Sequence, residues 1–325
     1  MKKTNISALL LAALLLIQLL CAPVSAVTAE PAADAQADAQ TASDNSAEDA
    51  AAADDSVPED QLLSSREQFS VAAKAALLID LNTNRVVYEQ DADERVYPAS
   101  LTKIMTCLIA LENGNLSDVV TVSESALADL DEDSSVAGLV VGEQMTLENL
   151  LYCMMVVSGN DACNVIAEHV AGSVTDFVRM MNQRAYELGC TNTHFNNPHG
   201  LHDESHYTTA RDLAIITQAA LKSENFRQIV DTYEYKLPDD NMRQNIPKLK
   251  TTNMLIYQSM SNSLYYPRAH GIKTGYTSQA GRCVISEATG DGLDLLGIVC
   301  GAATTVLDSG DLLMENFTEC ARLFD

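Results

Sequence analysis

Residues 72–90 read AAKAALLIDLNTNRVVYEQ, two apolar runs that flank the polar triplet Asn82-Thr83-Asn84. This pattern predicts two antiparallel strands joined by a tight turn. Comparable strand-like runs return near the other end of the sequence, in residues 270–277, 281–288 and 293–302. Because strands lie at both ends with helical sequence between them, we predict an α+β fold. Both chain ends build one antiparallel sheet, helices cover its two faces, and further helices form a subdomain.

The middle of the chain has helical periodicity. Pro98 can open a helix, and after it apolar residues recur every three or four positions as far as Gly114. Further helices are predicted to begin near Thr146, Ser173 and Thr209 and to include the C-terminal stretch 312–324.

Residues 1–26 have the order of a secretory signal peptide. Lys2 and Lys3 precede a long apolar run, which ends in small residues at Ala26. An uncleaved membrane anchor is the alternative, although the run is short for a span of about 20 residues. A lipoprotein signal through Cys21 is a weaker reading, because a bulky leucine precedes the cysteine.

Residues 27–66 are predicted to form a disordered acidic linker, since they contain many acids and few side chains to bury. This leaves residues 67–325 as the folded domain. The net charge of the whole chain is −25. Nucleic acid is therefore excluded as an expected partner, because phosphate binding needs a basic face.

The sequence beyond the signal peptide contains an odd number of cysteines, without a paired CxxC spacing. We interpret them as small buried apolar residues, while a disulfide stays open for an exported protein. They are Cys107, Cys153, Cys163, Cys190, Cys283, Cys300 and Cys320.

The stretch YPASLTKIMT at 97–106 places Ser100 and Lys103 three residues apart. On a helix these positions share a face, so the amine can reach the hydroxyl. A serine nucleophile needs a base, and a lysine can act as one only when it is neutral. Burial or a second cation lowers the lysine pKa toward that state. One such pair is expected by chance in about 300 residues, so the pair needs support from elsewhere.

Two further motifs supply that support. Ser158-Gly159-Asn160 interrupts an apolar helical run, which can turn a hydroxyl and an amide toward a cleft. Lys273-Thr274-Gly275 lies on a predicted strand, where a glycine often marks close approach of another backbone. A substrate could add to this strand as a further strand.

Ser-x-x-Lys, Ser-x-Asn and Lys-Thr-Gly in this order are the motif set of the penicilloyl serine transferases, which this chain resembles. Residues 70–325 closely resemble the low-molecular-mass D-alanyl-D-alanine carboxypeptidases, which are penicillin-binding proteins. The similarity extends through AALLIDLNTNRVVYEQ, TLENLLYCMMVVSGNDA, NPHGLHDESHYTTARDLA and GIKTGYTSQAG. It implies a β-lactamase/transpeptidase-like fold for the catalytic domain 67–325, and no metal or cofactor.

The resemblance also implies roles for the motif residues. Ser100 would attack the carbonyl between the last two D-alanines of a peptidoglycan stem peptide, with Lys103 as the base and Ser158 as proton donor to the leaving D-alanine. Lys273 would lower the pKa of Ser158 and help to keep Lys103 neutral. Asn160 would hold the amide groups of the substrate, and Thr274 and Lys273 would receive its terminal carboxylate. Gly275 belongs to the same implied binding strand, and the backbone N–H groups of Ser100 and Tyr276 would form the oxyanion hole.

The expected partners are the stem peptide and β-lactam antibiotics, which should acylate Ser100. The expected location is the cell wall or envelope, with membrane contact only through an uncleaved N-terminal segment. One departure concerns Asp308, which stands where family members often carry an arginine that supports carboxylate binding. Carboxylate recognition could then depend more on Thr274, Lys273 or Arg282. The other is length, because relatives often continue into a second domain and a membrane-binding helix.

Three alternatives stay open at this point. A class A β-lactamase needs a glutamate with an asparagine four residues on, and Glu204 has no such asparagine. A metallopeptidase could use His199, His202 and His206 as zinc ligands, although their spacing suggests instead that they hold a loop by hydrogen bonds. A catalytically silent cell-wall binding protein would explain Asp308, but all three motif cores are intact.

Overall fold

The computed structural model describes residues 69–128, 130, 134–306 and 312–325, which belong to one compact unit. The predicted signal peptide, the acidic linker and Asp308 lie outside the described residues. None of the helices in the described part has both the length and the apolar character needed to cross a bilayer.

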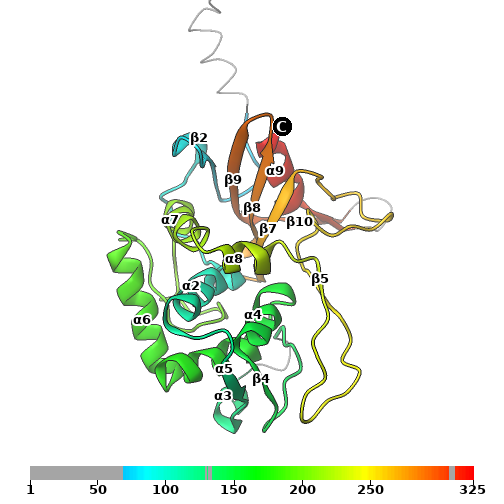
Figure 1. Ribbon diagram of the computed structural model, residues 1–325. Coiled ribbons are helices and arrows are strands. Elements are labelled where there is room, and N and C mark those ends of the chain that lie inside the picture. The colour runs from blue at the N-terminus through cyan, green and yellow to red at the C-terminus, as the bar shows by residue number, and fades with distance from the viewer. Residues whose placement is uncertain (1–68, 129, 131–133, 307–311) are drawn as a thin grey trace, which may run out of the picture. The chain divides into compact units, whose positions relative to one another are not determined.

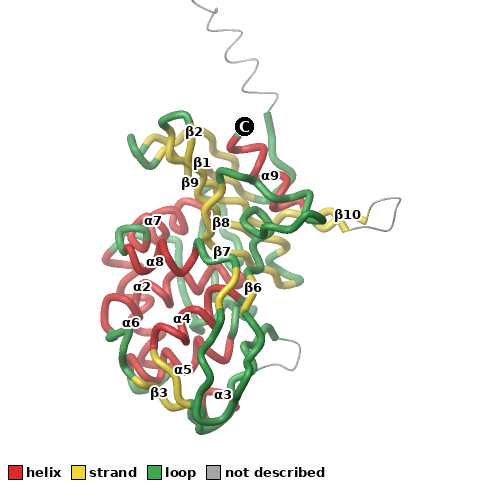
Figure 2. The backbone as a smooth tube through the Cα atoms, turned by 45° about the vertical axis from the view of Figure 1, so that its right-hand side comes forward, coloured by secondary structure: helices red, strands yellow, loops and turns green. Residues whose placement is uncertain are grey.

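Five antiparallel strands form the central sheet, as the sequence predicts (Figures 1 and 2). The strand order is β2-β1-β9-β8-β7, so β7 is an edge strand. The N-terminal hairpin joins the C-terminal strands through β1 and β9, where Leu77 pairs with Ile298. The strands are β1 (Ala75–Asp80), β2 (Arg85–Gln90), β7 (Ala269–Thr277), β8 (Gly281–Gly290) and β9 (Leu293–Ala302).

Both faces of the sheet are covered because side chains alternate along each strand. On β1, Leu77 faces a large core shared with most of the helices, and Leu78 faces a smaller core shared with α9 (Glu315–Phe324). Figure 1 shows α9 at one face of the sheet and the helical region at the other. Burial of both faces explains why the strands read as continuous apolar runs.

The helices beyond the sheet begin where the sequence predicts. The side chains of Thr146, Ser173 and Thr209 each accept a hydrogen bond from a backbone N–H in the first turn of the helix that follows. The helices of this region are α2 (Lys103–Asn113), α3 (Glu124–Ala128), α4 (Leu147–Val156), α5 (Asn160–Ala171), α6 (Val174–Glu187), α7 (Ala210–Ala220) and α8 (Glu224–Val230).

Two local predictions differ from the structure. The C-terminal stretch predicted as one helix starts with a strand, because its first residues pair with a strand that follows β9. Ser100 lies in a short 3-10 helix, η1 (Ala99–Thr102), and not in the first turn of α2. The small two-stranded sheets are β3 (Val119–Thr121) with β4 (Gln144–Thr146), β5 (Glu234–Tyr235) with β6 (Leu249–Lys250), and β10 (Thr304–Val306) with β11 (Leu312–Met314).

Candidate active site

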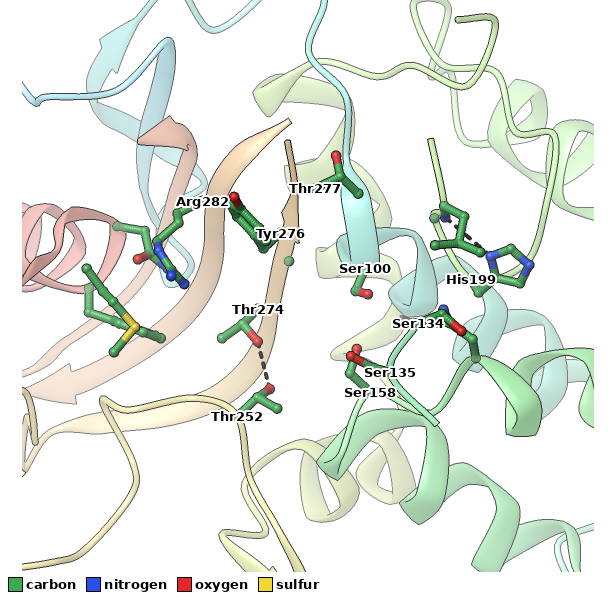
Figure 3. Close-up of a pocket in the computed structure, with 17 residues that line it drawn as sticks. Ser100, Ser134, Ser135, Ser158, His199, Thr252, Thr274, Tyr276, Thr277 and Arg282 are labelled. Carbon is green, nitrogen blue, oxygen red and sulfur yellow. Dashed lines mark hydrogen bonds between the residues drawn. The ribbon is translucent and has the colours of Figure 1, made fainter. Parts of the chain in front are cut away.

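The three motifs meet at one cavity of about 320 Å³. η1, the link between α4 and α5, and strand β7 each supply part of its wall, and Figure 3 shows Ser100 and Ser158 facing Thr274 across it. Residues that sequence analysis singled out and that line the cavity are Ser100, Ser158, Asn160, Thr274, Gly275, Tyr276 and Arg282. Lys103 and Lys273 do not line it, because both are buried in its wall.

Lys103 has three hydrogen-bond partners. Its Nζ lies 2.8 Å from Ser100 Oγ, 2.7 Å from Asn160 Oδ1 and 2.7 Å from the backbone oxygen of His199. The amide and backbone oxygens can only accept, so they take two N–H bonds from the lysine. A neutral amine then directs its lone pair at the remaining partner, the Ser100 hydroxyl. This is the arrangement that a base needs in order to remove the hydroxyl proton.

Burial favours the neutral amine. The Lys103 side chain is 0% exposed, and this burial lowers its pKa to about 8, although Cys163 and Asp161 oppose the shift. Lys273, 1% exposed, also has a pKa well below its ordinary value, first through burial and second through repulsion from Lys103. Burial of Lys103 itself is therefore the main cause of its lowered pKa, and the repulsion between the two amines lowers the pKa of Lys273.

Two serines of the site lie in or beside strained backbone. Ala99, just before Ser100, has φ of 47°, and Ser158 has φ of 63°. This left-handed region costs about 1–3 kcal/mol for residues other than glycine. Since neither position has a glycine or asparagine, the sequence contains no signal for these turns.

Asp161 fixes the loop that forms another part of the cavity wall. Its carboxylate accepts hydrogen bonds from the backbone N–H groups of Ala137, Gly138 and Leu139 at 2.9–3.0 Å. The N–H of Asn160 donates to the backbone oxygen of Ser135, which lines the cavity. This loop is not predicted from the sequence, in which the acid directly after Ser158-Gly159-Asn160 is the signal for it.

Gly275 lets β7 approach the nucleophile. A Cβ at this position would lie 3.0 Å from Ser100 N, 3.1 Å from Ala99 Cβ and 3.1 Å from Pro98 O. A Cβ here would be accommodated only if the neighbouring backbone moved by a few tenths of an ångström, so glycine favours the close approach. The Thr274 hydroxyl lies 2.7 Å from that of Thr252 and borders the cavity.

Two of the three histidines considered as zinc ligands, His199 and His206, hold the neighbouring loop by hydrogen bonds. His206 Nδ1 accepts the N–H of Asn196, so its Nε2–H donates to Thr102 Oγ1, whose hydroxyl donates to Ala99 O. His199 Nδ1 accepts the N–H of Leu201. Burial lowers the pKa of His199 to about 3 and of His206 to about 4, so both rings are neutral near pH 7.

The described cysteines give no chemistry to the cavity. All seven are buried and unpaired in the structure, and none lines the cavity. Burial raises the pKa of the Cys163 thiol, which lies beside the two lysines, to about 12. This thiol is therefore protonated near pH 7.

The sequence matches the D-alanyl-D-alanine carboxypeptidase family, peptidase S11, over residues 62–304. It is 40% identical over 240 residues to the D-alanyl-D-alanine carboxypeptidase DacF of Bacillus subtilis, covering 71% of this chain and 58% of DacF. It is 36% identical to DacA of Haemophilus influenzae, covering 72% of this chain and 58% of that protein. The chain therefore spans little more than half the length of these relatives.

Solved structures agree with this result. The fold is similar to the Streptomyces K15 DD-transpeptidase, with a TM-score of 0.69 and 29% identity over 79% of this chain and 97% of the other. It is also similar to penicillin-binding protein 5 from Haemophilus influenzae, with a TM-score of 0.67, 32% identity and coverage of 79% and 70%. The predicted fold class is confirmed, and none of the alternative functions is favoured.

Proposed function

Because the chain belongs to the D-alanyl-D-alanine carboxypeptidase family, we propose that it removes the terminal D-alanine from peptidoglycan stem peptides through an acyl-enzyme on Ser100. The observation that carries this proposal is the buried Lys103 amine, held by two acceptors and 2.8 Å from Ser100 Oγ. The cavity beside it can hold a short peptide along the edge strand β7.

In the acylation step, Lys103 takes the proton from Ser100 Oγ as this oxygen attacks the carbonyl carbon between the two D-alanines. The carbonyl oxygen, now negatively charged, receives hydrogen bonds from the backbone N–H groups of Ser100 and Tyr276. Close approach of β7 to η1 at Gly275 supports this pairing, since it brings the two backbones into contact.

Ser158 then passes its proton to the leaving amine and takes a proton from the Lys103 ammonium, which returns Lys103 to its neutral form. Asn160 orients the amides of the substrate. Thr274 is assigned to the terminal carboxylate, whereas Lys273 is buried in the wall and does not line the cavity. Water then attacks the acyl carbon as Lys103 takes a proton from it, and Lys103 returns this proton to Ser100 Oγ when the shortened peptide leaves. Ser158 lines the cavity at the junction of α4 and α5, which supports its assignment as the proton donor.

We propose that β-lactam antibiotics inhibit the protein covalently. We also propose that the protein is exported to the cell envelope. Export rests on the N-terminal pattern of Lys2, Lys3 and the apolar run. Fractionation of cells that express the full chain tests it, because a protein retained in the cytoplasm with an intact N-terminus contradicts the proposal.

The decisive experiment incubates the purified protein with a stem pentapeptide and measures released D-alanine, with and without penicillin. We expect release that penicillin abolishes, together with covalent labelling of the protein by a fluorescent penicillin. Ser100→Ala should lose both. Labelling of Ser100→Ala at the unmutated rate would refute the assignment of the nucleophile, and rapid turnover of a chromogenic cephalosporin would favour a β-lactamase instead.

A further inference from the structure

Arg282 occupies a defined position beside the cavity. It lies on β8 directly across from Tyr276 on β7. Thr274 pairs with Val284, two residues after Arg282, so Thr274 is a diagonal neighbour of Arg282 on the same face of the sheet. Its guanidinium carbon lies 5.0 Å from the centre of the Tyr276 ring, and Arg282 lines the cavity together with Ser100 and Thr274 (Figure 3). Diagonal neighbours across two antiparallel strands can reach each other with long side chains.

Two contacts orient the guanidinium. Arg282 Nε donates to Thr304 Oγ1, and the Tyr276 ring supports the group from one side. With Nε occupied, the two terminal nitrogens remain as the part of the planar fork that can bind a ligand. This fork matches the two oxygens of a carboxylate.

The charge of the cavity points to the same ligand. Among the described residues that line it, Arg282 has the only permanently charged side chain. Lys103 and Lys273 are buried in the wall, and burial lowers the pKa of both amines. A substrate carboxylate that leaves water needs a cation, because an unpaired buried charge is strongly unfavourable.

We propose that Arg282, together with Thr274, binds the free C-terminal carboxylate of the substrate and so makes the cavity select chain-terminal over internal peptide bonds. This inference rests on the proposed function. An internal peptide bond has no negative charge at this position, and it would leave the guanidinium partly desolvated without a partner. Arg282 thereby acts as a specificity-determining residue.

The test compares an acylated D-alanyl-D-alanine peptide with a free carboxylate to the same peptide with a C-terminal primary amide. The variants are Arg282→Gln, which keeps a polar N–H donor and removes the charge, and Arg282→Lys, which keeps the charge. Arg179→Ala, an exposed arginine on α6, is the control. In Arg282→Gln we expect KM for the free acid to rise roughly 10- to 100-fold, a smaller change in kcat, and no change in kcat/KM for the amide.

Arg282→Lys should recover part of the preference for the free acid, and Arg179→Ala should retain all of it. If the Arg282→Gln protein had the same melting temperature, the same KM and the same preference for the free acid over the amide as the unmutated protein, the inference would be overturned. The proposed function would remain intact. Absence of D-alanine release from the unmutated protein would instead contradict the proposed function.

A second readout judges Arg282 independently of D-alanine release. The acylation rates of Ser100 by a penicillin and by its methyl ester are compared by mass spectrometry. We expect the unmutated protein to prefer the free acid and Arg282→Gln to lose this preference. The same ratio in both proteins would overturn the inference.

Discussion

The pH dependence of Ser100 acylation tests the role of Lys103 directly. Burial lowers the pKa of Lys103 to about 8, and only the neutral amine can take the serine proton. With this pKa the neutral fraction is about 1% at pH 6, about 9% at pH 7 and about 90% at pH 9. The rate constant for acylation should therefore rise about tenfold from pH 6 to pH 7, and about tenfold again by pH 9.

The assay is stopped-flow or quenched labelling with a fluorescent penicillin at subsaturating concentration, from pH 6 to pH 9. Lys103→Arg keeps a charge but stays protonated throughout this range, so acylation should fall about 10²- to 10⁴-fold. Lys222→Arg, an exposed lysine next to α7, is the matched control and should keep the profile. A rate that is constant from pH 6 to pH 9, or labelling of Lys103→Arg at the unmutated rate, would refute the reasoning.

Three further predictions concern single side chains. In Gly275→Ala the new Cβ would lie 3.0 Å from Ser100 N. This variant should therefore label with penicillin at least tenfold more slowly and be less stable by about 1–3 kcal/mol. Labelling at the normal rate would contradict the need for a small residue at this position. Asp161→Ala should increase amide hydrogen exchange in the loop that its carboxylate holds, and unchanged exchange there would show that other contacts suffice. Arg227→Ala removes the partner of the buried Glu287 carboxylate, so it should lower the free energy of unfolding by roughly 1–3 kcal/mol in urea titrations. An unchanged midpoint and slope of the urea transition would show that Glu287 is satisfied without Arg227.

Much of the scaffold could be predicted from the sequence because its signals are local. The Asn82-Thr83-Asn84 turn between apolar runs marks the hairpin, and Ser173 marks a helix start by accepting the N–H of Asp176. Such signals depend on neighbours within a few residues. They therefore hold whatever the rest of the fold does.

Other features depend on contacts between distant segments. The position of Arg282 across from Tyr276 follows from strand register, which the two separate strand predictions leave open. The positive φ of Ala99 is imposed by its surroundings, since alanine has no preference for it. Similarly, β11 is a strand because β10 pairs with it, and its own sequence resembles the helix that follows.

The pairing of β1 with β9 also makes reactivity a late product of folding. Residues 75–80 pair with residues 295–300, so the sheet closes only after more than two hundred intervening residues are available, and contacts of such high sequence separation form slowly. Until β7 docks against η1, Ser100 lacks the strand that completes its site. During synthesis the nucleophile should consequently remain unreactive, and penicillin labelling should measure complete folding of the chain as well as inhibitor binding.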